Sequence, residues 1–136
     1  MADKTPSQLD SILLDLTDRA ESNLLGALLI AGTDDTRAAI EAVSKIVSED
    51  CFLYSWRNGL HRRAFRAMLE APRTDIISVS STMHNQGILE KNDIAVMSHY
   101  IAEAITSFDC SYYAELVKHL ADERSGRTPI RFKGAI

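Results

Sequence analysis

The chain has few of the residues that build disulfide scaffolds and glycine-rich loops. Its 136 residues include two cysteines, three prolines and six glycines, and 7% are aromatic. Cys51 and Cys110 show no C-x-x-C spacing, so we expect reduced thiols packed as small apolar side chains, with a redox or metal role as the alternative. Disorder of the whole chain is not expected, because 46% of the residues are apolar and 25% are charged.

A long hydrophobic run is also missing. The longest apolar stretch, residues 24–31, is interrupted by Gly26 and is far shorter than the roughly 20 residues that a membrane-spanning helix needs. The first 20 residues do not form a signal peptide, because their apolar side chains are interleaved with acids. We therefore expect a cytoplasmic protein that does not contact a membrane.

The motifs of a nucleotide-driven motor are absent. A P-loop has the pattern G-x-x-x-x-G-K-[ST], whose backbone amides hold the phosphates. No glycine here precedes Lys-Ser or Lys-Thr, and Gly126-Arg127-Thr128 lacks the upstream glycine because residue 121 is alanine. A serine nucleophile on a G-x-S-x-G turn is absent too. The sequence predicts no ATPase site, no enzyme activity and no cofactor.

The four histidines give little support to a metal site. None belongs to an H-x-x-x-H or H-E-x-x-H pair, the spacing that places two zinc ligands on one face of a helix. His99 and Glu103 are one helical turn apart and could serve a metal-dependent hydrolase. A solvated contact between neighbours on a helix is the simpler interpretation. We predict no metal ligands.

Positive charge is concentrated in two parts of an acidic chain. The net charge is −4, yet residues 57–73 hold five arginines and one acid, and residues 124–136 hold four bases and no acid. Such a chain is not expected to coat nucleic acid unspecifically, which takes many phosphate contacts. Four arginines could still form a surface for nucleic acid or an acidic partner, with a face paired to acids of the same chain as the alternative: Arg57, Arg62, Arg63 and Arg66.

The apolar residues recur at helical spacing along nearly the whole chain. Residues 24–30 are apolar on most sides, as in a helix at the centre of a bundle. Asp75 is expected to cap a helix that ends at Gly87. The next two helices are expected to bury Ile94, Met97, Ile101 and Ala104, and then Tyr113, Leu116, Val117 and Leu120.

These patterns predict an all-α fold, a compact orthogonal bundle of about seven helices. We expect an N-terminal amphipathic helix within residues 1–20 and a helical domain over residues 21–123. Residues 124–136 are expected to form a basic tail.

With the helices placed, the order of motifs resembles the N-terminal domain of DnaB-type replicative helicases. Residues 21–29 resemble that family's E-x-x-x-L-G-A-L-L, residues 46–52 its L-x-x-E-D-F, and residues 61–68 its H-R-x-I-F-x-A-M with Ala64 at the isoleucine. Residues 75–79, 87–90, 100–101 and 112–117 continue the series. The resemblance implies the all-helical head of such helicases, a protein-interaction domain in DNA replication without catalytic function.

The resemblance also implies partners. It suggests a homodimer or higher homo-oligomer, and contact with a replicative helicase, a primase or a helicase loader. Predicted partner-binding residues lie on the last helix: Tyr113, Leu116, Lys118 and Arg124. The chain departs from the family in an insertion between Phe52 and His61. It also lacks the helix that follows residues 112–117 in the family and forms a hairpin with them, and it lacks the motor domain. We therefore expect a separate binding protein. The alternative function is a small all-α nucleic-acid-binding regulator that uses the arginine helix and the basic tail.

Overall fold

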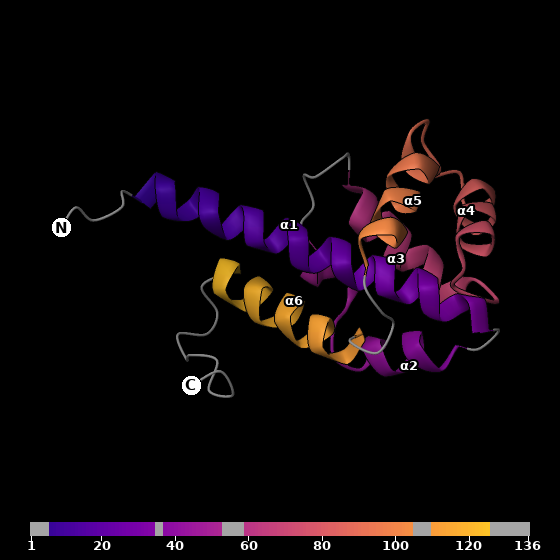
Figure 1. Cartoon of the computed structure of the whole chain (residues 1–136), viewed down its shortest axis with the longest axis horizontal. Coiled ribbons are helices and arrows are strands. Elements are labelled where there is room, and N and C mark those ends of the chain that lie inside the picture. The colour runs from indigo at the N-terminus through magenta and orange to yellow at the C-terminus, as the bar shows by residue number, and fades with distance from the viewer. Residues whose placement is uncertain (1–5, 35–36, 53–58, 105–109, 126–136) are drawn as a thin grey trace.

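The structure is all-helical in the part of the chain that it describes. The computed structural model describes residues 6–34, 37–52, 59–104 and 110–125. The predicted fold class is confirmed, with six α-helices in these ranges rather than about seven and with no strand in them. The elements follow one another along the chain (Figure 1): α1 (Pro6–Ala31), η1 (Gly32–Asp34), α2 (Ala38–Ser44), η2 (Glu49–Cys51), α3 (Leu60–Glu70), α4 (Ile76–Asn85), α5 (Asp93–Glu103) and α6 (Cys110–Ser125).

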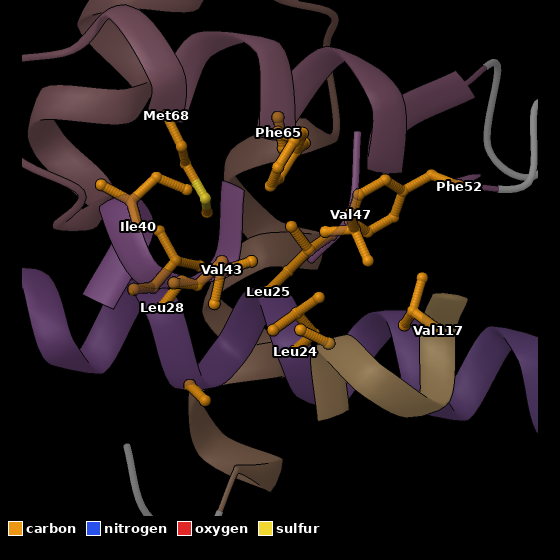
Figure 2. Packing of buried hydrophobic residues seen from close by; sticks show 14 of the residues in the cluster. Leu24, Leu25, Leu28, Ile40, Val43, Val47, Phe52, Phe65, Met68 and Val117 are labelled. Carbon is orange, nitrogen blue, oxygen red and sulfur yellow. The ribbon is translucent and has the colours of Figure 1, made fainter. Parts of the chain in front are cut away.

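The second half of α1 forms the centre of the bundle. Leu24, Leu25 and Leu28 are completely buried, and α1 packs against α5, α6 and α3. Figure 2 shows side chains of several elements converging on these leucines, among them Ile40 from α2 and Val117 from α6. Burying each such side chain stabilises the fold by about 1.5–3 kcal/mol. The prediction of a central helix that is apolar on most sides is confirmed.

No break separates the predicted N-terminal helix from the rest of the domain. Helix α1 is continuous from Pro6 to Ala31, because residues 7–25 contain neither glycine nor proline. The Thr17 hydroxyl donates to the Leu13 carbonyl, one turn earlier, at 2.8 Å, and the helix continues past this residue. The predicted boundary at residues 20 and 21 therefore lies inside one helix, whose first half runs antiparallel beside α6 (Figure 1).

Gly26 allows α1 and α5 to cross at very short distance. A Cβ atom at this position would overlap the carbonyl oxygen of Tyr100 and would lie 2.9 Å from its carbonyl carbon. It would also lie 3.0 Å from the Cβ atom of Ala104. Gly26 therefore does not interrupt the helix; its missing side chain sets the position of α5 against α1.

Helix α4 begins and ends at the residues that the sequence predicts. The Asp75 carboxylate accepts a hydrogen bond from the Ser78 amide at 3.1 Å, which is an N-cap. At the other end Gly87 has a φ of 75°, and the Ile88 amide donates to the Met83 carbonyl at 2.9 Å. This is the Schellman arrangement that glycine favours after a helix.

Arg37 donates hydrogen bonds to carbonyl groups at the C-terminal end of helix α3. Its guanidinium group donates to the carbonyl oxygens of Met68 at 3.1 Å and Leu69 at 2.9 Å, and also to that of Ala71. The last carbonyls of a helix have no partner inside the helix, and a cation there also complements the helix dipole. This contact fixes the start of α2 against the end of α3.

The buried face of α5 differs from the predicted one. Met97 is buried as expected, but Ile94 is 47% exposed, and the other buried residues are Asp93 and Tyr100. Compared with the prediction, α5 turns a different face toward the core, because Asp93 and Tyr100 have buried polar partners. Apolar spacing does not reveal such partners. In α6, Val117 and Leu120 are buried as predicted, together with Ala114, whereas Tyr113 and Leu116 are half-buried.

Candidate partner-binding surfaces

Two arginines of α3 brace the short helix η2. Arg62 and Arg66 are one turn apart and lie on one face of α3. Arg62 Nε donates to the Phe52 carbonyl at 2.8 Å, and Arg66 Nη2 donates to Glu49 Oε2 at 2.5 Å. The hydrogen bond from Arg66 lowers the pKa of the Glu49 carboxyl, and the same contact raises the pKa of Arg66. The two charges therefore stabilise each other in the folded domain.

Arg63 lies on another side of α3 and ties it to α5. Its Nη1 atom donates to the Ile88 carbonyl at 2.8 Å and to Asp93 Oδ2 at 2.5 Å. The Asp93 carboxylate also accepts from the Glu90 amide at 2.8 Å. Both charged side chains are largely buried, 13% and 7% exposed. Removing either partner would leave a buried charge uncompensated, so this pair holds the helices together.

The predicted nucleic-acid surface is thus largely engaged within the domain. Arg57 lies outside the described residues. Arg62, Arg63 and Arg66 all have acceptors in the same chain, the arrangement given above as the alternative. Arg66 is the most exposed, at 51% against 28% and 13% for Arg62 and Arg63. Contact with nucleic acid stays a prediction, and Arg66 is its best-placed residue.

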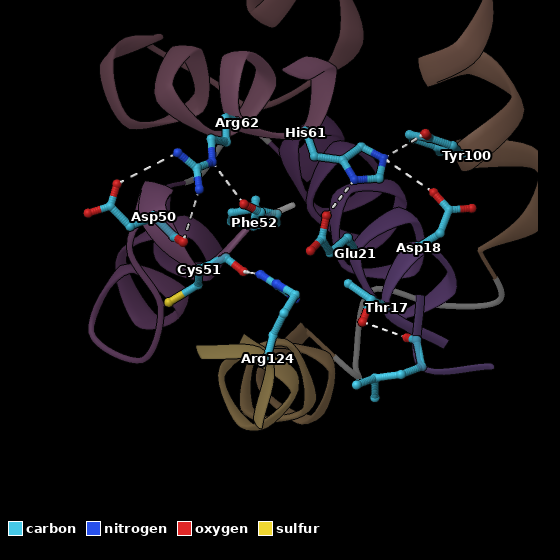
Figure 3. A network of polar contacts seen from close by, with 11 residues as sticks. Thr17, Asp18, Glu21, Asp50, Cys51, Phe52, His61, Arg62, Tyr100 and Arg124 are labelled. Atoms are coloured by element: carbon cyan, nitrogen blue, oxygen red, sulfur yellow. Dashed lines mark hydrogen bonds and ion pairs between the residues drawn. The ribbon is translucent and has the colours of Figure 1, made fainter. Parts of the chain in front are cut away.

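A small polar pocket between η2 and α6 brings together residues from both predicted sets. Arg62, Lys118 and Arg124 all line it, and Arg124 Nη2 donates to the Cys51 carbonyl at 2.9 Å (Figure 3). The pocket has a volume of about 280 Å³, and its other lining residues are Ser48, Asp50, Cys51, Ala121 and Asp122. Three basic side chains therefore meet at one site, although Arg62 on α3 is distant in the sequence from Lys118 and Arg124 on α6.

The other two predicted partner residues do not belong to this pocket. Tyr113 and Leu116 are half-buried and pack against the hydrophobic core. Tyr112, by contrast, is 62% exposed, and its ring meets that of Tyr113 edge-on at 5.3 Å. Partner binding by Tyr113 and Leu116 stays a prediction, and the structure gives both residues a role in packing.

A buried polar network connects α1, α3 and α5. His61 Nδ1 lies 2.6 Å from Glu21 Oε1, and His61 Nε2 lies 2.7 Å from the Tyr100 hydroxyl (Figure 3). With Glu21 ionised, the Nδ1–H donates to its carboxylate, while Nε2 shares a hydrogen bond with the Tyr100 hydroxyl and lies 4.0 Å from Asp18 Oδ1. The His61 side chain is fully buried and that of Glu21 is 1% exposed. The network therefore acts as a structural tie between three helices.

The network was not foreseen from the sequence, although its members stand in the quoted motifs. Glu21 opens residues 21–29, His61 opens residues 61–68, and Tyr100 opens residues 100–101. A polar residue kept at a core position of a helical pattern is a signal that it has a buried partner. What the sequence does not give is which three residues meet.

An open groove of about 570 Å³ lies between α1 and α5. Its lining includes Asp15, Asp18, Tyr100 and the pair His99 and Glu103. The last two are in contact at 3.1 Å, with side chains 65% and 59% exposed, as expected for a solvated pair on one helix. Within the described ranges no group of three or more His, Cys, Asp or Glu side chains could hold a metal ion.

The first half of α1 leaves apolar side chains uncovered. Ile12 is 41% exposed, Leu14 40% and Leu16 51%. Leu13, between them, is partly buried against the core. Because successive residues point about 100° apart around a helix, α6 alone cannot cover all four side chains. This stretch, residues 12–16, is called the uncovered α1 segment below.

A family model described as the DnaB-like helicase N-terminal domain matches residues 16–119. The match covers most of the chain and runs from α1 to α6. The chain belongs to this family. The resemblance found in the sequence is thereby confirmed. Comparison with curated proteins gives no match. None of the described helices is long and apolar enough to cross a lipid bilayer.

The DnaB-like match begins inside α1 and ends inside α6. The described residues outside it, 6–15 and 120–125, prolong these two antiparallel neighbours. Ile12 and Leu14 lie in the first extension, and Arg124 lies in the second. Both candidate surfaces of this DnaB-like domain, the uncovered α1 segment and the basic pocket, therefore include residues that the family model does not match.

Proposed function

We propose that this DnaB-like domain is a non-catalytic binding module that acts in DNA replication in the cytoplasm. It pairs with further copies of itself or contacts a replicative helicase, a primase or a helicase loader. The observation that carries the proposal is the uncovered α1 segment. Ile12 and Leu16, 41% and 51% exposed, lie one turn apart on a helix whose second half is enclosed, and Leu14, 40% exposed, lies on the opposite side of that helix. Apolar patches of this kind mark interaction sites on soluble proteins.

The geometry of the segment suits packing against another helix. Ile12 and Leu16 are one turn apart and so lie on one side of α1, as a short apolar stripe. Asp15 and Arg19, which form an exposed ion pair at 3.3 Å, border this stripe. An apolar stripe edged by charges is the arrangement through which amphipathic helices recognise helical partners. The family supports the choice of replication proteins as partners.

The test is a double substitution, Ile12→Ser with Leu16→Ser. Both side chains are about half exposed, so the domain is expected to fold normally. The variant should lose self-association in size-exclusion chromatography with light scattering, or lose retention by immobilised helicase, primase or loader. Ile77→Ser is the matched control, because Ile77 is 75% exposed on α4, away from the segment. The control should behave as the unmodified domain.

Two outcomes would contradict the proposal. One is a domain that is monomeric at every concentration and is retained by none of the three proteins. The other is binding that survives the double substitution. Steeply salt-dependent binding of DNA that is lost in Arg66→Gln would instead support the nucleic-acid-binding regulator.

A further inference from the structure

The pocket between η2 and α6 holds a hydrogen-bond donor without an acceptor. Arg124 Nη2 donates to the Cys51 carbonyl at 2.9 Å. The other terminal nitrogen, Nη1, is shielded from solvent and has no acceptor among the residues that the structure describes. A shielded donor on a charged group is unfavourable unless an acceptor approaches it. Arg124 is one of the residues that line the pocket, so this donor lies on a side chain at the pocket's edge.

The charges around this donor are unbalanced. The lining has three bases, Arg62, Lys118 and Arg124, against the two acids Asp50 and Asp122. Asp50 is held loosely, since its side chain is 93% exposed and its carboxylate lies 4.0 Å from the Arg62 guanidinium. The Lys118 amine lies 3.3 Å from the Asp122 carboxylate and is itself 40% exposed. The pocket therefore favours an anion of single charge.

We propose that this pocket binds one carboxylate side chain, an aspartate or a glutamate, of a partner protein. The proposal rests on the function proposed above, since it gives the binding module a second contact point. A guanidinium group offers a planar pair of N–H donors that matches a carboxylate. A volume of about 280 Å³ admits one acidic side chain, not a whole helix. The pocket thereby adds charge recognition to the apolar contact on α1.

A nucleic-acid backbone fits the pocket less well. Phosphates are bound by many basic side chains in a row. Here the carboxylates of Asp50 and Asp122 interrupt the positive charge. Arg63, the next base on α3, is held by Asp93 on another side of the helix. A single carboxylate needs only the one site that the pocket offers.

The probe is N-acetylglutamic acid α-amide, which carries one side-chain carboxylate and no other charge. Its titration is followed by NMR at the Nε–Hε groups of Arg62 and Arg124 in the whole chain at constant ionic strength. Saturable shifts are expected at both. The neutral N-acetylglutamine amide should produce none. Arg124→Gln should weaken binding by at least about tenfold, because it removes the charged donor.

Two further variants keep the test clear of folding effects. Lys118→Gln removes only a partly exposed surface pair and should weaken the probe several-fold. Arg19→Gln removes an arginine outside the pocket and should leave the affinity unchanged. The proposal is overturned if the carboxylate gives no saturable shift, if Arg124→Gln and Lys118→Gln bind it as well as the unmodified chain, or if inorganic phosphate binds more tightly. Loss of partner retention with intact probe binding would overturn only the replication role.

Discussion

The two halves of helix α1, residues 6–18 and 19–31, contain four leucines each and have different surroundings. In the second half Leu24, Leu25 and Leu28 are completely buried, whereas in the first half Ile12 and Leu16 are 41% and 51% exposed. Helices α2, α3, α5 and α6 all contact α1. In Figure 1 the helices α2, α3 and α5 lie toward its second half, whereas the first half has α6 beside it and faces α5 across the open groove. The burial of a helix therefore depends on how many neighbouring helices the rest of the chain places around it, and not on its number of leucines.

This difference predicts that the second half of α1 contributes mainly to the stability of the fold and that the first half is available for the proposed binding. Side chains of the second half contribute free energy of folding, because they leave water when the chain folds. Under the proposed function, the exposed side chains of the first half would contribute free energy of binding instead, when a partner covers them. Substitutions in the two halves should consequently change different measured quantities.

The largest effect on the unfolding free energy is expected when one leucine in each half of α1 is shortened to alanine. Leu28→Ala creates a cavity at the centre of the bundle and should lower the free energy of unfolding by about 2–5 kcal/mol. Leu16→Ala should change it by less than about 0.5 kcal/mol, because the side chain is half exposed. Urea unfolding followed by circular dichroism, at concentrations at which the chain is monomeric, measures both. Equal losses in the two variants would remove the distinction between the halves.

The sequence predicts the parts of this fold that depend on local chemistry. The Asp75 cap, the Gly87 turn and the apolar second half of α1 follow from residue type and spacing, and all three are confirmed. The continuity of α1 through residue 20 could also be read from the lack of glycine and proline before Gly26. The predicted boundary there follows the start of the DnaB-like motifs at residue 21.

Other features depend on partners that are distant in the sequence. The rotation of α5 follows from Asp93 meeting Arg63 and Tyr100 meeting His61. The basic pocket likewise needs Arg62 and Arg124 to be brought together by the packing of η2 against α6. Apolar periodicity carries no information on such pairs, so Arg62 and Arg124 were predicted as separate candidates and their grouping was not.

A second, intermediate effect is expected from a substitution at Gly26, in the second half of α1. Alanine is a better helix former than glycine by about 1 kcal/mol, so Gly26→Ala would stabilise an isolated helix. In this domain the added Cβ atom would overlap the Tyr100 carbonyl, a backbone group that cannot move away without shifting α5. We therefore expect a net loss of about 1–3 kcal/mol in unfolding free energy. A stabilised variant would show that the two helices separate easily.

The smallest effect is expected when one carboxylate in each half of α1 is replaced by its amide. Glu21 is buried beside His61 at 2.6 Å, whereas Asp15 forms an exposed pair with Arg19 at 3.3 Å. Glu21→Gln keeps the shape and an acceptor oxygen but replaces a charge-assisted hydrogen bond with a neutral one, so it should lower the unfolding free energy by about 1 kcal/mol. Asp15→Asn should change it by less than about 0.5 kcal/mol. Because both changes are isosteric, thermal unfolding of the two variants isolates the effect of burial, and a larger loss for Asp15→Asn would place the stabilising charge in the first half of α1.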